Sequence, residues 1–304
     1  MQNQQTVSQD IELIGKEAYG GCEVEVSISP SKPDTGIIFD LSYGDIPARL
    51  EYAKSNAFSI LLEKDKARLL CSEHLLANLK YGCDIDNAIV KVRKIPSKSF
   101  EILQELNLAT KTQAIPYNPN FDKTLYEKIR ETGTKEQNKK RKILRLEEKI
   151  NTGELIFIPK KTNELVIKAI TYYEPIGEQE RTIPITPETY NEIVGARGFC
   201  KFIPGFMPES ISRFFGGILM YPTHGLGTGV SSKTSFRKKY TIRGWEKQEK
   251  IPAEISCHKI VDLLGALSLL DGKLEGTYIE CQLSGHKNDL AFLNRYKYKF
   301  KEKV

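Results

Sequence analysis

The sequence lacks any long apolar stretch, since nowhere do roughly 18 apolar residues follow one another as a membrane-spanning helix requires. Its first ten residues, MQNQQTVSQD, have no cationic start followed by an apolar run, which is the pattern of a secretory signal. These absences argue against an integral membrane protein and against an exported one. We therefore expect a soluble, cytoplasmic protein with no stable insertion into a membrane.

Paired cysteines are also missing. The six cysteines are scattered over 304 residues without a C-x-x-C pair, which excludes a dense disulfide scaffold and a cysteine zinc ribbon. Reduced thiols are expected. Histidine is scarce as well, with four in the chain, so each one can be considered singly.

A broad basic character is absent too. The 45 Lys and Arg residues against 39 Asp and Glu residues give a net charge of +6, and two short runs exceed it. Residues 139–145 (KKRKILR) carry +5 and residues 295–303 (RYKYKFKEK) carry +4, which leaves −3 for the remainder. The sequence therefore predicts no nucleic-acid partner. In the second run lysines alternate with aromatic residues, as on an edge strand protected from aggregation; attraction to nucleic acid or to a membrane is the alternative.

What the chain does have is enough apolar material for a packed core, with 40% hydrophobic residues. Strands are predicted at 22–28, 36–39 and 87–92, and a helix runs from Ser72, its N-cap, to about residue 79. A second helix at 257–270 is followed by a glycine turn and a strand at 276–283. Helix, glycine turn and strand thus occur once in each half, and this indicates two α+β halves.

The predicted domain organisation follows from composition. An N-terminal α+β domain spans 1–115, a polar linker or insertion with a charged, helical-looking piece spans 116–138, and a C-terminal α+β domain spans 139–304. In the last domain the segments 143–148, 154–158 and 164–172 alternate like a meander. A short helix at 187–194 would be capped by Thr186.

Two histidine motifs could carry chemistry. His258 and Asp262 are spaced i, i+4 in an apolar helix, which places both side chains on one face where they could chelate a divalent metal. Glu73 and His74 begin the other helix, so that one could bind a metal while the other reaches its water. The alternatives are a helix-surface pair and a solvated first turn.

The other two histidines follow glycine-rich turns. His286 comes after Ser284-Gly285 and would act as an acid if a carboxylate or metal lay near it; otherwise it is an exposed loop residue. His224 lies in a glycine-rich loop and receives no role. Two histidines, an aspartate, a glutamate base and a further histidine make up the composition of a hydrolytic zinc site.

Six short motifs then resemble one enzyme family, in the order in which that family has them. They are residues 34–39 (DTGIIF), 46–49 (IPAR), 73–76 (EHLL), 85–88 (IDNA), 258–262 (HKIVD) and 284–286 (SGH). The family is UDP-3-O-acyl-N-acetylglucosamine deacetylase, the zinc amidase of lipid A biosynthesis. The resemblance extends from about residue 11 to about residue 295.

The resemblance implies a two-domain β-α-α-β sandwich with the site between the domains. It implies one Zn²⁺ per chain, a monomer, and an acylated UDP-amino sugar or similar small molecule as substrate. It also implies metal-assisted amide hydrolysis. The residues that match the family's functional positions are His74, His258 and Asp262 as zinc ligands, Glu73 as general base, His286 as partner of the leaving group, and Lys259, Arg197 and Phe199 as substrate contacts.

Several positions depart from the family pattern. Gly198 replaces a threonine that helps hold the oxyanion, and Ala266 replaces an aspartate that orients the catalytic histidine. Residues 17–21 and 95–99 differ from two family loops. Residues 202–230 are apolar enough for an acyl-chain passage, but the same residues suit a core. Two other functions thus stay open: a divergent zinc hydrolase of another acyl amide or ester, and a non-catalytic protein stabilised by zinc.

Overall fold

The computed structural model describes residues 2–17, 22–56, 59–95, 112–116, 119–173, 177–196, 251–282 and 285–303. The predicted substrate contacts Arg197 and Phe199, the replaced position Gly198, His224 and the apolar segment 202–230 lie outside these residues.

A five-stranded sheet forms the N-terminal side of the molecule. Its strand order is β2 (Ile11–Lys16), β3 (Glu23–Pro30), β9 (Ala88–Lys94), β4 (Ile37–Leu41) and β5 (Gly44–Pro47). Alternate residues of β3, namely Val24, Val26 and Ile28, are buried, because successive side chains of a strand point to opposite faces. One face of this sheet therefore packs on the core.

A second five-stranded sheet forms the C-terminal side. Its order is β13 (Ile150–Asn151), β14 (Leu155–Pro159), β18 (Thr277–Gln282), β15 (Leu165–Tyr173) and β16 (Gly177–Pro184). The predicted meander is wrong here, because β18 lies between β14 and β15, antiparallel to the former and parallel to the latter. Strand β12 (Ile143–Leu146), expected in the same meander, pairs in a different sheet.

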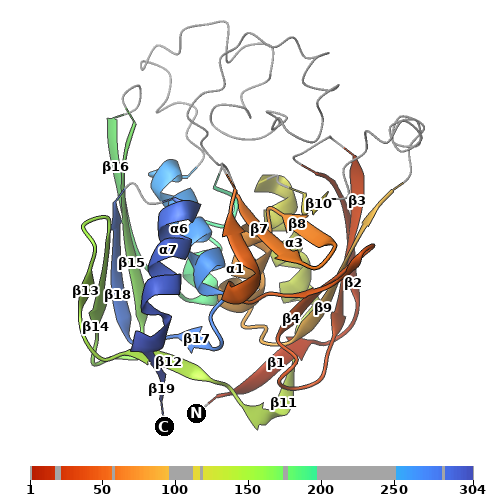
Figure 1. The fold of residues 1–304 in the computed structure, drawn as a ribbon, viewed down its shortest axis with the longest axis horizontal. Coiled ribbons are helices and arrows are strands. Elements are labelled where there is room, and N and C mark those ends of the chain that lie inside the picture. Colours follow the sequence, from red (N-terminus) through yellow and green to blue (C-terminus); the bar gives the residue numbers. More distant parts are fainter. Residues whose placement is uncertain are drawn as a thin grey trace, which may run out of the picture.

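Helices fill the space between the two sheets in two layers (Figure 1). The N-terminal layer contains α1 (Glu73–Ala77), which continues into the π-helical turn η2 (Asn78–Gly82), and α3 (Pro119–Thr132). The C-terminal layer contains α6 (Glu254–Leu267) and α7 (His286–Tyr296), and the short α4 (Pro187–Tyr190) contacts η2. The predicted α+β fold, a β-α-α-β sandwich, is confirmed.

The two helix layers meet closely where α1 crosses α6. A Cβ atom at Gly265 would lie 2.4 Å from the carbonyl oxygen of Glu73, so only glycine permits this approach. Every residue of α1 is buried, and so is every residue of α6 except Lys259. This burial on nearly all sides explains why apolar residues occur all around both helices, and it also buries the polar residues Glu73, His74, His258 and Asp262.

Segment 116–138 contains α3 and most of β11 (Thr134–Lys140). Phe121, Leu125 and Ile129 are buried at i, i+4 and i+8 and face the N-terminal half, where α3 contacts β2 and η2. The helical-looking piece of this polar segment is thus an amphipathic helix packed on the first half. The domain limits at 115 and 139 stay a prediction.

Smaller sheets complete the fold. Their orders are β10 (Gln113–Ala114), β8 (Ala67–Leu70), β7 (Ile60–Lys64), β6 (Ala53–Ser55); β1 (Asn3–Val7), β11; and β17 (Lys273–Leu274), β12, β19 (Phe300–Glu302). The 3₁₀ turns η1 (Leu50–Tyr52) and η4 (Lys297–Lys299) precede β6 and β19. The predicted edge strand of the basic tail is therefore limited to β19, because α7 and η4 occupy the residues before it. None of the described helices is long and apolar enough to cross a membrane.

Candidate metal centre

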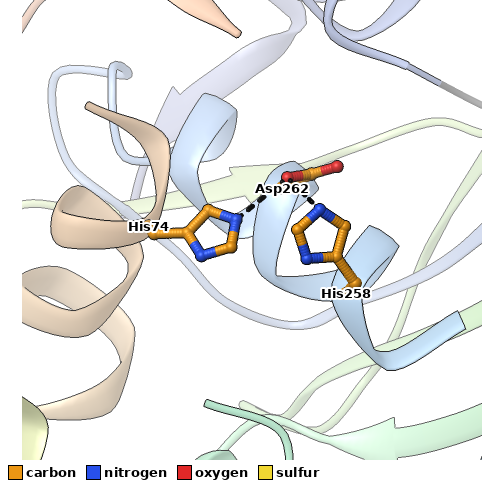
Figure 2. A group of neighbouring side chains, drawn as sticks. All are labelled: His74, His258 and Asp262. Atoms are coloured by element: carbon orange, nitrogen blue, oxygen red, sulfur yellow. Dashed lines mark ion pairs between the residues drawn. The ribbon is translucent and has the colours of Figure 1, made fainter. Parts of the chain in front are cut away.

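His74, His258 and Asp262 come together between the two helix layers (Figure 2). One ligand atom from each of the three residues lies within 4.8 Å of the others. The Oδ1 atom of Asp262 is 3.3 Å from Nε2 of His74 and 3.4 Å from Nε2 of His258. All three side chains are buried, so the helix-surface and solvated-turn alternatives do not describe these residues.

The helices explain how residues distant in sequence meet. His258 and Asp262 are one turn apart on α6, and α1 brings His74 to the same point from the other half. Because Gly265 lets the α1 backbone lie directly against α6, a short side chain such as aspartate reaches across the contact. Ser72 stands at the predicted N-cap position of α1, although its side chain makes no capping hydrogen bond.

Each of the three side chains also contacts a residue outside the cluster, and it does so through the atom that points away from the other two side chains. Nδ1 of His74 lies 2.8 Å from Oδ2 of Asp122 on α3. Nδ1 of His258 lies 3.3 Å from the carbonyl oxygen of Ala196. Lys259 donates to Oδ2 of Asp262 over 2.7 Å. These outer contacts orient the two Nε2 atoms and Oδ1 of Asp262 toward one another.

The surroundings set different pKa values for the two histidines. Burial lowers the pKa of His258 to about 3. Burial acts in the same direction on His74, but the carboxylates of Asp122 and Asp262 outweigh it and raise the pKa of His74 to about 10. For Asp262, His258 and Lys259 outweigh burial and hold the carboxyl pKa well below its usual range. The carboxylate of Asp262 and the neutral imidazole of His258 are thus available as ligands, and His74 would release its proton on binding a metal.

Glu73 and His286 lie beside the cluster. Glu73 is fully buried, and its Oε2 accepts a hydrogen bond of 3.1 Å from the backbone N–H of Ile60. His286, the first residue of α7, has Nε2 at 3.8 Å from Oε1 of Glu73 and 3.9 Å from Oδ1 of Asp262. His286 was expected in a loop, whereas it begins a helix whose N-cap is Gly285.

The donor set fits a zinc ion. Two histidines and one carboxylate are the ligands of a zinc site that keeps a fourth position open. Oδ1 of Asp262 and Oε1 of Glu73 are buried and accept no hydrogen bond from the part of the chain that the structure describes. Buried carboxylate oxygens are costly without a partner, and a cation between them and the imidazoles would supply one.

The structure thus brings together His74, His258, Asp262, Glu73 and His286, with Lys259 bonded to the cluster. Ala266 is buried in α6, so the carboxylates within 4 Å of His286 among the described residues are those of Glu73 and Asp262.

Sequence reasoning missed Asp122. A signal was available, because Asp122 lies one turn before the buried Tyr126 and next to the buried Phe121, on the apolar side of a helix. An acidic residue in such a position needs a buried partner. Asn78 supports the same contact, since its Nδ2 donates to the backbone oxygen of Asp122 and its Oδ1 accepts from Tyr190.

Comparison with known proteins gives a consistent result. The family model "UDP-3-O-acyl N-acetylglycosamine deacetylase" matches residues 4–297. Among curated proteins, the UDP-3-O-acyl-N-acetylglucosamine deacetylase of Nitratidesulfovibrio vulgaris is 26% identical over 96% of this chain and 86% of its own length. The protein of the same name from Chlamydia abortus is 26% identical over 95% of this chain and 94% of its own length. That from Aliarcobacter butzleri is 24% identical over 96% and 89%.

Proposed function

Because the chain belongs to the UDP-3-O-acyl N-acetylglycosamine deacetylase family, we propose that it is a zinc-dependent hydrolase that removes the N-acetyl group from UDP-3-O-acyl-N-acetylglucosamine in lipid A biosynthesis. The observation that carries the proposal is the buried convergence of His74, His258 and Asp262 beside Glu73. His286 stands within 4 Å of that glutamate.

His74, His258 and Asp262 would hold one zinc ion. A zinc ion in such a site acidifies a bound water and polarises a carbonyl group. The chain contributes the rigidity of the site, because each ligand is oriented by Asp122, Ala196 or Lys259.

Glu73 is suited to accept a proton. Its Oε2 atom is fixed by the Ile60 N–H, so that Oε1 is the atom that faces the cluster. Burial raises the pKa of Glu73, and a raised pKa makes a carboxylate a better proton acceptor near neutral pH. We therefore assign Glu73 the role of general base.

His286 is suited to the amine that leaves. Its side chain is 10% exposed, and its Nε2 lies 3.8 Å from Oε1 of Glu73 and 3.9 Å from Oδ1 of Asp262. A cation in that position stabilises negative charge on the reacting carbonyl group and can pass a proton to the amine.

The residues proposed to contact substrate are Lys259, Arg197 and Phe199. Lys259 is partly exposed at 22% and bonds Asp262, so its ammonium group lies next to the reacting centre. We assign it, together with Arg197 and Phe199, to binding of the acylated UDP-amino sugar, a role in which cations would pair with the diphosphate.

The deciding experiment measures zinc content and acetate release from UDP-3-O-acyl-N-acetylglucosamine. We expect about one zinc per chain with turnover. Glu73→Gln should keep the zinc and lose on the order of 10²–10⁴-fold in turnover, whereas His74→Ala and His258→Ala should lose the zinc. The matched control is Glu51→Gln, a change at an exposed glutamate, which should leave both quantities unchanged.

Other outcomes would redirect the assignment. Full turnover by Glu73→Gln would contradict the role of the base, and zinc content unchanged in both histidine variants would contradict the ligand set. Zinc without turnover on this substrate would favour another acyl amide or ester, and no zinc after reconstitution would favour a binding protein.

A further inference from the structure

The two most basic runs of the sequence are neighbours in the fold. Strand β12 begins in the first run and ends one residue beyond it, and it pairs antiparallel with β19, which lies in the second run. Both strands lie at the end of the molecule that carries the C-terminus (Figure 1). Segments more than 150 residues apart, each with a surplus of positive charge, therefore form one surface.

The pairing sorts side chains onto two faces. Leu146 pairs with Phe300, and both belong to the hydrophobic core. The next pair, Arg145 with Lys301, points to the opposite face. The backbone N–H of Lys303 donates to the carbonyl oxygen of Ile143, so the chain stays paired to this point. Because Lys303 follows Lys301 by two residues, it lies on the same face. The outer side of this sheet is thus basic.

We call this outer surface the basic face. Arg145 also bonds Asn163 in the adjacent turn, which brings that turn and its exposed lysine to the same side. We define the basic face as Arg145, Lys301 and Lys303 of the sheet, exposed Lys161 of the bonded turn, and exposed Lys297 of η4, the turn directly before β19. The four lysines are exposed, and none of them forms an ion pair within the described ranges.

Repulsion between these like charges lowers the stability of the folded protein. Like charges directly opposite each other on a sheet destabilise the pair, and Arg145 faces Lys301 in this way. Protection of an edge strand accounts for lysines on β19, which is an edge, but not for Arg145, since β12 is the central strand of the sheet. A surplus of charge maintained at a cost indicates an anionic partner.

An exposed aromatic ring favours a phospholipid surface over a nucleic acid as the anionic partner. Tyr298 lies between Lys297 and Lys299 and is 61% exposed. Tyrosine flanked by lysines is typical of surfaces that rest on the boundary between lipid and water. A single-stranded nucleic acid would instead need a series of rings on which successive bases stack, and the other exposed large rings of the described part, Tyr43 and Tyr172, belong to other elements.

We propose that the basic face docks the protein reversibly on an anionic phospholipid surface, through its lysines and the ring of Tyr298. This goes beyond the proposed enzymatic function and does not depend on it. No part of the chain needs to span the bilayer, because each lysine near an anionic membrane contributes by charge alone.

The test is sedimentation of the full chain with vesicles of phosphatidylcholine that contain phosphatidylglycerol, with pure phosphatidylcholine as the neutral reference. We expect binding to the anionic vesicles that weakens as salt is added. The triple variant Lys297→Gln/Lys301→Gln/Lys303→Gln should bind on the order of 100-fold more weakly, from about fivefold per lysine. Tyr298→Ser should bind several-fold more weakly at unchanged charge.

The control is Lys32→Gln/Lys66→Gln/Lys91→Gln, which removes the same charge from exposed positions of the N-terminal half. It should keep most of the binding. Absence of binding by the native chain, or an equal loss in the control, would overturn the proposal. So would displacement from the vesicles by single-stranded RNA at matched phosphate concentration, because the basic face would then prefer nucleic acid.

Discussion

Two clusters of charged side chains lie where the halves of the molecule meet, and they differ in how completely their polar atoms are hydrogen-bonded. The metal cluster is His74, His258 and Asp262. The second, which we call the Arg141 cluster, joins Arg141 and Lys273 of the C-terminal half to Asp84 and Asp86 of the N-terminal half. Its arginine side chain is 2% exposed.

In the Arg141 cluster every donor of the guanidinium group is used. Nε and Nη2 donate to Asp86 Oδ2 over 3.0 and 2.8 Å, and Nη1 donates to Asp84 Oδ1 over 3.1 Å. The second N–H of Nη1 donates to Gln2 Oε1 over 3.1 Å, and that of Nη2 donates to the backbone oxygen of Asp84 over 2.6 Å. In the metal cluster, by contrast, buried Oδ1 of Asp262 accepts no hydrogen bond from the described residues. A cluster whose polar atoms are all hydrogen-bonded can hold two parts of a fold together. A cluster of metal-ligand atoms with a buried oxygen that accepts no hydrogen bond indicates a binding site for a further group, here a cation.

The largest effect is expected from breaking the satisfied cluster. Arg141→Ala removes the guanidinium group from Asp86 and leaves Asp84 with Lys273 alone, so the free energy of unfolding should fall by about 3 kcal/mol, as measured by urea denaturation. The control is Arg93→Ala, whose pair with Asp40 is 36% and 29% exposed and should cost less than about 1 kcal/mol. Equal losses in the two variants would show that burial of Arg141 adds nothing.

A smaller effect, on zinc rather than on folding, is expected from the contact behind the metal cluster. Asp122→Asn removes the charge that orients His74, so zinc affinity should fall about 10–100-fold, as measured by competition with a chelator. Glu127→Gln on the exposed side of the same helix should leave the affinity unchanged. An unaltered affinity in Asp122→Asn would remove Asp122 from the site.

The smallest effect concerns pH. Burial alone would raise the pKa of Asp84, but Lys273 and Arg141 outweigh it and hold the pKa below its usual value. The carboxyl of Asp84 is protonated at a higher pH in the unfolded chain than in the folded one. The ionised carboxyl therefore contributes its full stability above the unfolded pKa, and this contribution is lost as pH falls through the folded pKa.

Asp84→Asn should therefore flatten the decline of stability in acid. Asparagine tolerates the positive φ of 59° that Asp84 has at this turn. The control is Asp45→Asn at an exposed position. Urea midpoints that decline in parallel for native chain and Asp84→Asn would contradict the contribution of this group.

Local patterns predicted much of the fold. Thr186 caps α4 as expected, and its hydroxyl accepts from the N–H of Thr189. Strands β3, β4 and β9 and helix α6 lie within a few residues of their predicted positions, because alternation and helical periodicity are properties of short stretches. The order of β14, β18 and β15 could not be read in this way, since a strand from a distant part of the chain enters between two consecutive ones.

The candidate site divides along the same line. His258 and Asp262 were predictable as a pair because one helical turn separates them, and Glu73, His74 and His286 were candidates from their own motifs. The resemblance matched all five to functional positions of one family. Contacts made across elements were not predictable. Asp122 reaches His74 from a helix that reads as a polar segment, and Arg145 faces Lys301 through a pairing of distant strands.

The ligand types, the α+β class and the uneven placement of charge could be predicted, because each depends on which residues occur and on their spacing along a short segment. Packing of the elements sets which of these groups are buried and which face solvent. Burial turns Glu73 and Asp262 from ordinary carboxylates into acceptors that need a partner, and strand pairing turns two separate basic runs into one surface. Both results depend on packing between segments far apart in the chain.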